Sequence, residues 1–215
     1  MLQSVARGRF ITFEGGEGAG KTTQLERLAP WLEGRGLEVV RTREPGGTPG
    51  AEAVRRLLVE GAAERWLPST ELLLVAAARD DHLQRLILPA LARGAWVLCD
   101  RYTDSTYAYQ GVAGGLGPER IGALHERVLE APRPDLTVLL DLPPAVGLAR
   151  REAAGRSTRF DAMDDAFHAR VREGFLALAA GEPDRIAIVD AAADSDAVAA
   201  AVRVVVAGRF ALPAS

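Results

Sequence analysis

The order of apolar and polar positions along the chain predicts alternating strands and helices. Five short stretches are almost continuously apolar, as expected of strands buried on both faces of a sheet: 9–13, 37–42, 94–100, 136–142 and 185–191. After the first of them, Leu25, Leu28, Trp31 and Leu32 recur at steps of three and four residues, which is the spacing of an amphipathic helix. Similar patterns predict helices at 21–35, 49–60, 69–92, 118–129 and 195–207.

Strands that alternate with helices form right-handed βαβ units, and these build a parallel sheet with helices on both faces. We therefore expect an α/β fold, a three-layer sandwich around a five-stranded parallel sheet. The 215 residues contain no repeat, no low-complexity segment and no linker, so a single domain over 1–215 is expected.

Composition and charge argue against several kinds of protein. Hydrophobic residues make up 48% and charged residues 26% of the chain, and the net charge of −3 gives no general attraction to nucleic acid. No apolar run approaches the ~20 residues of a membrane span, and the first ten residues lack the apolar core of a secretory signal. The single cysteine, Cys99, cannot form an internal disulfide, and its apolar neighbours predict that it is buried. We expect a cytoplasmic protein without nucleic-acid or membrane partners.

The stretch after the first predicted strand has the composition of a phosphate-binding loop. Residues 15–22 fit the pattern G-x-x-x-x-G-K-[ST] without a mismatch. Its glycines allow several backbone N–H groups to face one anion, Lys21 can reach the β- and γ-phosphates, and the Thr22 hydroxyl can ligate Mg²⁺. A nucleoside triphosphate should therefore bind at Gly15, Gly16, Glu17, Gly18, Ala19, Gly20, Lys21, Thr22 and Thr23. The chain lacks the Asn-Lys-x-Asp run of a GTPase, whereas a P-loop ATPase regulated by a protein partner remains an alternative.

Further motifs follow in a fixed order: FEGGEGAGKTTQ (13–24), TREPGGT (42–48), AAARDDH (76–82), DRYTDSTYAYQG (100–111) and DLPP (141–144). By these motifs the chain resembles the thymidylate kinases, and the resemblance runs from residue 10 to about 190, which is nearly the whole chain. The P-loop alone is unspecific, but TREPGGT combined with the DRY segment is highly specific. The resemblance implies a P-loop kinase fold and the phosphorylation of dTMP to dTDP with Mg²⁺ and ATP, for dTTP synthesis. It also implies a homodimer. A kinase of another deoxynucleoside monophosphate is the nearest alternative.

The resemblance places the acceptor on several of these motifs. It implies that TREPGGT, with Glu44 and Pro45, lies over the monophosphate, although the sequence leaves open whether Arg43 or Glu44 points inward. It implies that Arg79 binds the phosphate or the base, that Arg101 clamps the phosphates of donor and acceptor, and that Asp100 helps to hold Mg²⁺. Residues implied to read or stack on thymine are Ser105, Thr106, Tyr109 and Gln110.

Each of these residues also has a plainer interpretation from the sequence alone. TREPGGT can be a surface turn, Arg79 can lie on a solvated helix face, and Tyr109 can be a core residue. One departure from the family pattern is Val75, which stands where an aromatic side chain normally stacks on thymine, four positions before Arg79. The loss of that stacking can cost on the order of 1 kcal/mol.

A basic segment follows the fourth strand and resembles the lid of these kinases, at about 150–161. It carries Arg150, Arg151, Arg156 and Arg159. Such a run is usually a solvated face, but in a kinase a lid brings arginines onto the migrating phosphoryl group. The P-loop contains no arginine, which resembles the bacterial pattern in which the lid supplies the basic groups. We expect Arg150 and Arg156 to be catalytic and Arg159 to contact the adenine side of ATP.

Glu17 is unusual because a carboxylate within an anion-binding loop should repel phosphate. The backbone N–H groups can face ATP while the side chain of Glu17 points away from it. The resemblance implies that it points toward the acceptor, where a sugar 3′-hydroxyl can donate a hydrogen bond, and where it can help to hold Mg²⁺ through water. A side chain that faces solvent is the alternative.

Overall fold

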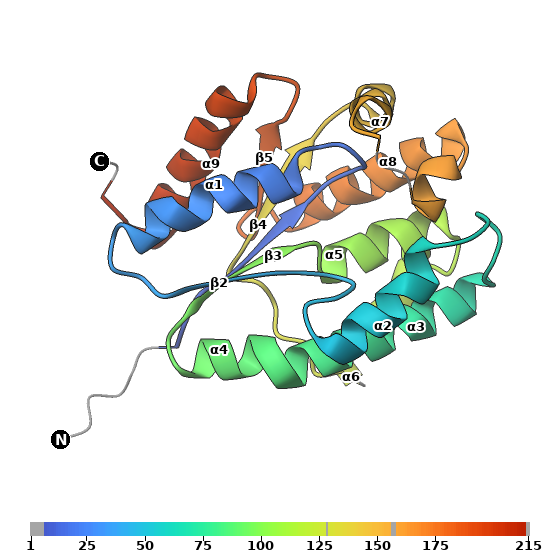
Figure 1. Cartoon of the computed structure of the whole chain (residues 1–215), viewed down its shortest axis with the longest axis horizontal. Coiled ribbons are helices and arrows are strands. Elements are labelled where there is room, and N and C mark those ends of the chain that lie inside the picture. Colours follow the sequence, from blue (N-terminus) through green and yellow to red (C-terminus); the bar gives the residue numbers. More distant parts are fainter. Residues whose placement is uncertain (1–6, 128, 156–157, 214–215) are drawn as a thin grey trace.

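The computed structural model describes residues 7–127, 129–155 and 158–213 (Figure 1). Its strands are β1 (Phe10–Glu14), β2 (Val39–Arg43), β3 (Trp96–Asp100), β4 (Leu136–Asp141) and β5 (Ile186–Asp190). The α-helices are α1 (Lys21–Glu33), α2 (Pro49–Val59), α3 (Pro68–His82), α4 (Leu88–Ala92), α5 (Thr103–Thr106), α6 (Pro118–Arg127), α7 (Pro144–Ala153), α8 (Asp165–Gly181) and α9 (Ser195–Phe210). Two π-helical segments, η1 and η2, and a 3₁₀ turn, η3, complete the elements: Leu83–Ile87, Tyr107–Ala113 and Arg159–Ala162.

The sheet has the strand order β2-β3-β1-β4-β5, and every neighbouring pair is parallel. The expected five-stranded parallel sheet is confirmed. Continuous burial holds for β1 and nearly so for β3 and β4, but it was wrong for the edge strands β2 and β5, where exposed positions such as Ile188 interrupt the pattern. An edge strand has a neighbour on one side only, so the helical layers cover it less completely.

Helices cover both faces of the sheet, as the alternating pattern predicted. On one face, α1 and α9 lie over β1, β3 and β4 (Figure 1). The core between them includes Phe13, Leu28 and Val202. The other face carries η1 and α4 over β1 and β3, and η2 and α8 beside β4 and β5. Cys99 is fully buried, as expected. Within the described ranges, no helix is both long and apolar enough to cross a membrane.

Two helical regions differ from the sequence prediction. The pattern over 69–92 forms three consecutive segments, α3, η1 and α4, rather than one helix. Pro89 lies at the start of α4, and its ring would clash with the carbonyl of Arg85 in a regular helix. The wider π-helical turn of η1, just before α4, makes room for this ring. Helix α8 was not predicted, although Phe167, Val171 and Phe175 recur at every fourth position and form its buried face.

Candidate active site

The P-loop lies at the carboxyl end of β1, the central strand, where open parallel sheets bind their ligands. Gly18 has a φ of 68°, and a Cβ added to it would lie 2.0 Å from the carbonyl oxygen of Gly147 in α7. The loop therefore contacts α7 backbone to backbone, and no larger residue fits at Gly18. This contact fixes the loop between α1, which begins at Lys21, and α7.

Lys21 is buried and its Nζ donates to the carbonyl oxygens of Gly15 and Gly16, at 3.1 and 2.7 Å. Burial and the nearby positive charge of Arg101 lower the pKa of Lys21 to about 8. A bound polyphosphate would supply the negative charge that this ammonium group needs. The geometry suits Lys21 for phosphate binding at the start of α1.

Thr22 and Asp100 meet at the carboxyl ends of β1 and β3. The Thr22 hydroxyl donates to Asp100 Oδ2 at 2.5 Å, and this pair is exposed. Across the described residues, no three His, Cys, Asp or Glu side chains form a cluster that could hold a metal by themselves. One hydroxyl and one carboxylate fit Mg²⁺, which keeps several waters and takes the rest of its ligands from substrate phosphates.

Glu17 does not face solvent, because only 11% of its side chain is exposed. Its carboxylate accepts hydrogen bonds from Arg101 Nη2 at 2.9 Å and from the Tyr109 hydroxyl at 2.8 Å, and Arg151 Nη1 lies 3.7 Å away. Burial alone would raise the pKa of Glu17, but Arg101, Lys21 and Tyr109 together lower it to about 2. Glu17 is therefore a carboxylate at neutral pH, directed from the P-loop toward η2.

Arg101 joins the P-loop to the segments expected to hold the acceptor. Its guanidinium group donates to the Gly15 carbonyl oxygen at 3.1 Å, to Ser105 Oγ at 3.1 Å and to the Tyr109 hydroxyl at 3.0 Å, besides Glu17. Burial disfavours its charge, but Tyr109, Glu17 and further acidic neighbours raise the pKa of Arg101 above its usual value. A permanently charged arginine is thus held between the two halves of the site.

A second buried cluster lies beneath the TREPGGT loop. Arg79 is 2% exposed and donates from Nε to Glu44 Oε2 at 2.7 Å and from Nη1 to His125 Nε2 at 2.6 Å. His82 Nδ1 donates to the other oxygen of Glu44 at 3.0 Å. Burial and the charge of Arg79 lower the pKa of His125 to about 3, so this ring is neutral and accepts from Arg79. The alternative of a solvated Arg79 does not hold.

The structure also settles the direction of the neighbouring side chains in TREPGGT. Arg43 points to the surface and pairs with Glu52, with 53% of its side chain exposed, whereas Glu44 is buried. Arg55 of α2 donates to the Pro45 carbonyl oxygen at 2.7 Å, and burial together with the charge of Arg43 lowers its pKa. The sequence analysis missed Arg55, although an arginine this close to a loop expected to lie over a phosphate is a candidate ligand.

The residues expected to surround thymine are brought together on α5, η2 and α3. Ser105, Thr106, Tyr109 and Gln110 are all buried, and Gln110 Nε2 donates to Glu71 Oε1 of α3 at 2.7 Å. Val75 is half-buried on α3, one turn before Arg79.

The lid arginines lie differently from the sequence expectation. Arg150 donates to the carbonyl oxygen of Ala191 at 3.0 Å, at the end of β5, whereas its neighbour Arg151 pairs with Asp161 and approaches Glu17. Arg156 lies outside the described residues.

The expected position of Arg159 on the adenine side requires correction. Its guanidinium group donates to the carbonyl oxygens of Leu58 and Ala63, at 3.0 and 2.7 Å, and pairs with Glu71. These partners belong to α2, the segment after it, and α3, so Arg159 is directed toward the helix that carries Val75 and Arg79. Only 2% of its side chain is exposed, and the two carbonyl groups and the carboxylate compensate for the burial of its charge.

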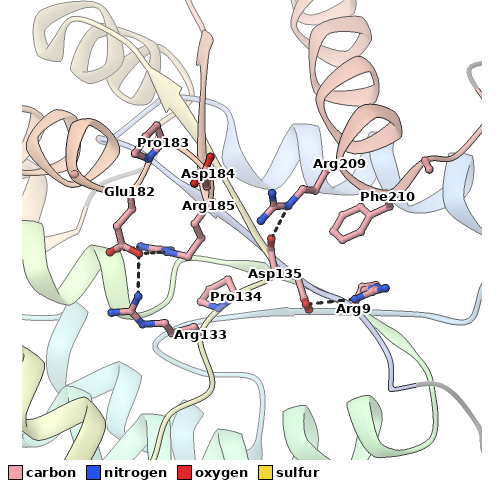
Figure 2. A pocket seen from close by; sticks show the side chains of 12 residues that line it. Arg9, Arg133, Pro134, Asp135, Glu182, Pro183, Asp184, Arg185, Arg209 and Phe210 are labelled. Carbon is pink, nitrogen blue, oxygen red and sulfur yellow. Dashed lines mark hydrogen bonds and ion pairs between the residues drawn. The ribbon is translucent and has the colours of Figure 1, made fainter.

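A wide hollow of about 780 Å³ lies apart from this site (Figure 2). It is lined by residues that precede three strands, including Arg9 before β1, Asp135 before β4 and Arg185 before β5. It therefore opens at the amino ends of the strands, opposite the P-loop. Its arginines already contact acidic or carbonyl groups: Arg9 pairs with Asp135, and Arg209 donates to the Asp135 carbonyl oxygen. We do not assign it to the active site.

Comparisons with known proteins agree with this geometry. A family model described as thymidylate kinase matches residues 13–202. A thymidylate kinase of Caulobacter vibrioides is 56% identical over 208 residues, covering 97% of this chain and 100% of that protein. One of Pseudomonas putida is 55% identical over 191 residues, covering 89% and 91% of the two chains. The crystal structure of thymidylate kinase from Ehrlichia chaffeensis has a TM-score of 0.76 at 35% identity and covers 93% of this chain and 99% of that one. The chain therefore belongs to the thymidylate kinase family.

Proposed function

We propose that this enzyme transfers the γ-phosphoryl group of ATP to the 5′-phosphate of dTMP, with Mg²⁺ bound at Thr22 and Asp100. One observation supports this most directly: Arg101 bonds at once to the P-loop, through Gly15 and Glu17, and to Ser105 and Tyr109 of the acceptor side. A phosphoryl transfer between two nucleotides needs such a bridge, because the donor and acceptor phosphates repel each other.

The donor side consists of the P-loop and Lys21. Backbone N–H groups of Gly15–Thr22 and the start of α1 bind the β- and γ-phosphates, and Lys21 exchanges its bonds to Gly15 and Gly16 for the phosphate oxygens. Mg²⁺, when bound, neutralises part of the phosphate charge. Thr22 and Asp100 hold it at the edge of this loop.

On the acceptor side, the attacking phosphate oxygen is already anionic, so no strong general base is required. Arg101 and Arg55 bind the acceptor phosphate beneath TREPGGT, while Ser105, Thr106, Tyr109 and Gln110 surround the base. The Glu44–Arg79 pair belongs to this side too, and Arg79 contacts the base or the phosphate of the acceptor while Glu44 holds its guanidinium group. Glu17 accepts a hydrogen bond from the deoxyribose 3′-hydroxyl, which favours an acceptor that carries one.

For the lid we favour Arg151 as the catalytic arginine, because its guanidinium group approaches Glu17 while that of Arg150 is bonded to the Ala191 carbonyl. It stabilises the negative charge of the transferring phosphoryl group. Arg156 stays a candidate from the sequence. The resemblance also suggests a cytoplasmic homodimer, and sedimentation velocity of the purified chain would give a monomer mass if the dimer does not form.

The acceptor is tested with a panel of dTMP, dUMP, dCMP, dGMP and AMP in a coupled assay of ADP formation. We expect the highest kcat/KM with dTMP. Faster turnover of another monophosphate would favour the alternative that Val75 leaves open, a kinase of another deoxynucleotide. ATP hydrolysis that ignores all five monophosphates would contradict the proposal.

A further inference from the structure

Glu14 is a fully buried carboxylate immediately before the P-loop, and the reaction described above gives it no role. It is the last residue of β1 and none of its surface is exposed. Its Oε1 accepts from the backbone N–H of Tyr102 at 2.7 Å and from that of Ser105 at 3.3 Å. Its Oε2 accepts from the Ser105 hydroxyl at 2.5 Å. Both oxygens of Glu14 thus bind the segment that follows β3.

These bonds act on Arg101 in two ways, through the next residue in the chain and through its guanidinium group. Arg101 has a φ of 70°, a left-handed conformation that is unfavourable for a residue with a Cβ, and Tyr102 is the next residue in the chain. The bond from Tyr102 N–H to Glu14 therefore fixes the turn immediately after this strained residue. Backbone strain of this kind persists only where surrounding contacts enforce it.

Ser105 connects Glu14 to the guanidinium group of Arg101. Because the Ser105 hydroxyl donates its single proton to Glu14, its oxygen is oriented to accept, and Arg101 Nη1 donates to it at 3.1 Å. If Glu14 no longer accepts this bond, the Ser105 hydroxyl can rotate and direct its proton toward Arg101 instead of its lone pair. The direction of one serine hydroxyl thus depends on Glu14.

Burial of a carboxylate at this position costs desolvation free energy, which indicates that its hydrogen bonds to Tyr102 and Ser105 have a role beyond packing. Burial raises the pKa of Glu14 to about 7, and Asp104 of α5 adds to the increase, while Ser105 and Arg101 oppose it. Packing alone would be satisfied by an apolar residue, as at the neighbouring core positions of β1.

We propose that Glu14 is a positioning residue for phosphoryl transfer. It fixes the turn at Arg101 through Tyr102 and orients the guanidinium group through Ser105, so that Arg101 is held between donor and acceptor phosphates. This rests on the proposed role of Arg101. Glu14 touches neither substrate and serves the rate of transfer rather than the binding of ATP.

Two substitutions separate this role from general stability. Glu14→Gln keeps the shape and one acceptor oxygen, but places an amide N–H₂, which cannot accept, opposite the Ser105 hydroxyl or the Tyr102 N–H. Ser105→Ala removes the hydroxyl that bonds to both Glu14 and Arg101 but keeps the backbone N–H bond to Glu14, whereas Ser105→Thr retains a hydroxyl. Glu182→Gln is a control for the loss of one carboxylate, since Glu182 bonds to Arg185 before β5, at the amino ends of the strands.

With dTMP as acceptor, we expect kcat of Glu14→Gln to fall by about 10- to 100-fold, because a misplacement of ~1 Å can cost ~10²-fold in rate. The dissociation constant of ATP, measured by calorimetry, should change by less than about threefold, since the backbone N–H groups and Lys21 remain in place. Ser105→Ala should show a smaller loss of kcat, Ser105→Thr should restore most of it, and Glu182→Gln should match the wild type.

An unchanged kcat in Glu14→Gln, or losses of ATP affinity as large as the loss of kcat, would overturn the proposal. If Glu14→Gln does not fold, Ser105→Ala decides, and a wild-type kcat in that variant would reject the role. Failure of the proposed function is recognised separately, because it appears in the wild-type enzyme as a lack of turnover with dTMP.

Discussion

Arg150 and Arg151 are adjacent in α7, yet the structure predicts opposite consequences for their removal. We expect Arg151→Ala to reduce kcat strongly while ATP binding stays nearly unchanged, whereas Arg150→Ala should change neither kcat nor ATP binding. The reason is direction: Arg151 Nη1 lies 3.7 Å from Glu17 Oε2, whereas Arg150 Nη1 donates to the Ala191 carbonyl oxygen.

The expected loss of kcat in Arg151→Ala follows from the charges in the site. Two unit charges about 4 Å apart attract by ~4 kcal/mol at an effective dielectric constant of 20, which suits a side chain that is 21% exposed. Asp161 also pairs with Arg151 and neutralises part of its charge, so the share available to the transferring phosphoryl group is smaller. A loss of about 3 kcal/mol corresponds to ~10²-fold in kcat. For Arg150→Ala, one lost hydrogen bond should lower the free energy of unfolding by about 1 kcal/mol.

The assay is ADP formation at saturating ATP and dTMP, with ATP affinity measured separately and urea unfolding recorded for both variants. Because both residues lie on the same helix and carry the same charge, Arg150→Ala controls for the loss of one positive charge near the site. An equal loss of kcat in the two variants would show that net charge, not the position of Arg151, matters. A kcat within twofold of wild type in Arg151→Ala would refute its assignment as the catalytic lid arginine.

Two further predictions concern Glu17 and Val75. Since the pKa of Glu17 is lowered to about 2, its carboxylate stabilises the folded state above pH ~4.5, and this contribution, up to about 3 kcal/mol, is lost as the pH falls from ~4.5 toward 2. Glu17→Gln should flatten this part of the curve of unfolding free energy against pH, and an unaltered slope would contradict the ion pair with Arg101. Val75→Phe should restore a stacking ring worth about 1 kcal/mol and lower KM for dTMP about fivefold at unchanged KM for ATP, whereas an equal shift in both constants would reject this explanation.

The sequence predicted those parts of the site in which neighbouring residues determine the local geometry. The P-loop, with its glycines and the start of α1, and the segment after β3 fall into this class, since each lies within about ten residues of the end of a central strand. The sheet could also be predicted from the sequence, because strands that are buried on both faces are continuous apolar runs. Helix α8 was missed even though its apolar positions have a clear helical spacing.

Other features depend on contacts between distant segments, which no local pattern encodes. Arg150 and Arg151 differ by ~100° of helix rotation, so the choice between them depends on how α7 packs on the P-loop. The choice between Arg43 and Glu44 depends on Arg79 and His82, which are contributed by α3. Arg159 illustrates the same limit, because its partners in α2 and α3 are 88 or more residues away in the sequence.

The contact between Gly18 and Gly147 limits which substitutions the site can accept during evolution. A Cβ on Gly18 would meet the Gly147 carbonyl oxygen at 2.0 Å, and a Cβ on Gly147 would meet the Glu17 carbonyl oxygen at 2.0 Å. Neither position can accept a larger residue while the other keeps its backbone in place. The P-loop and the first turn of α7, the helix that carries Arg151, therefore form one rigid unit. Substitutions in either segment have to preserve the backbone of the other, in evolution as in protein engineering.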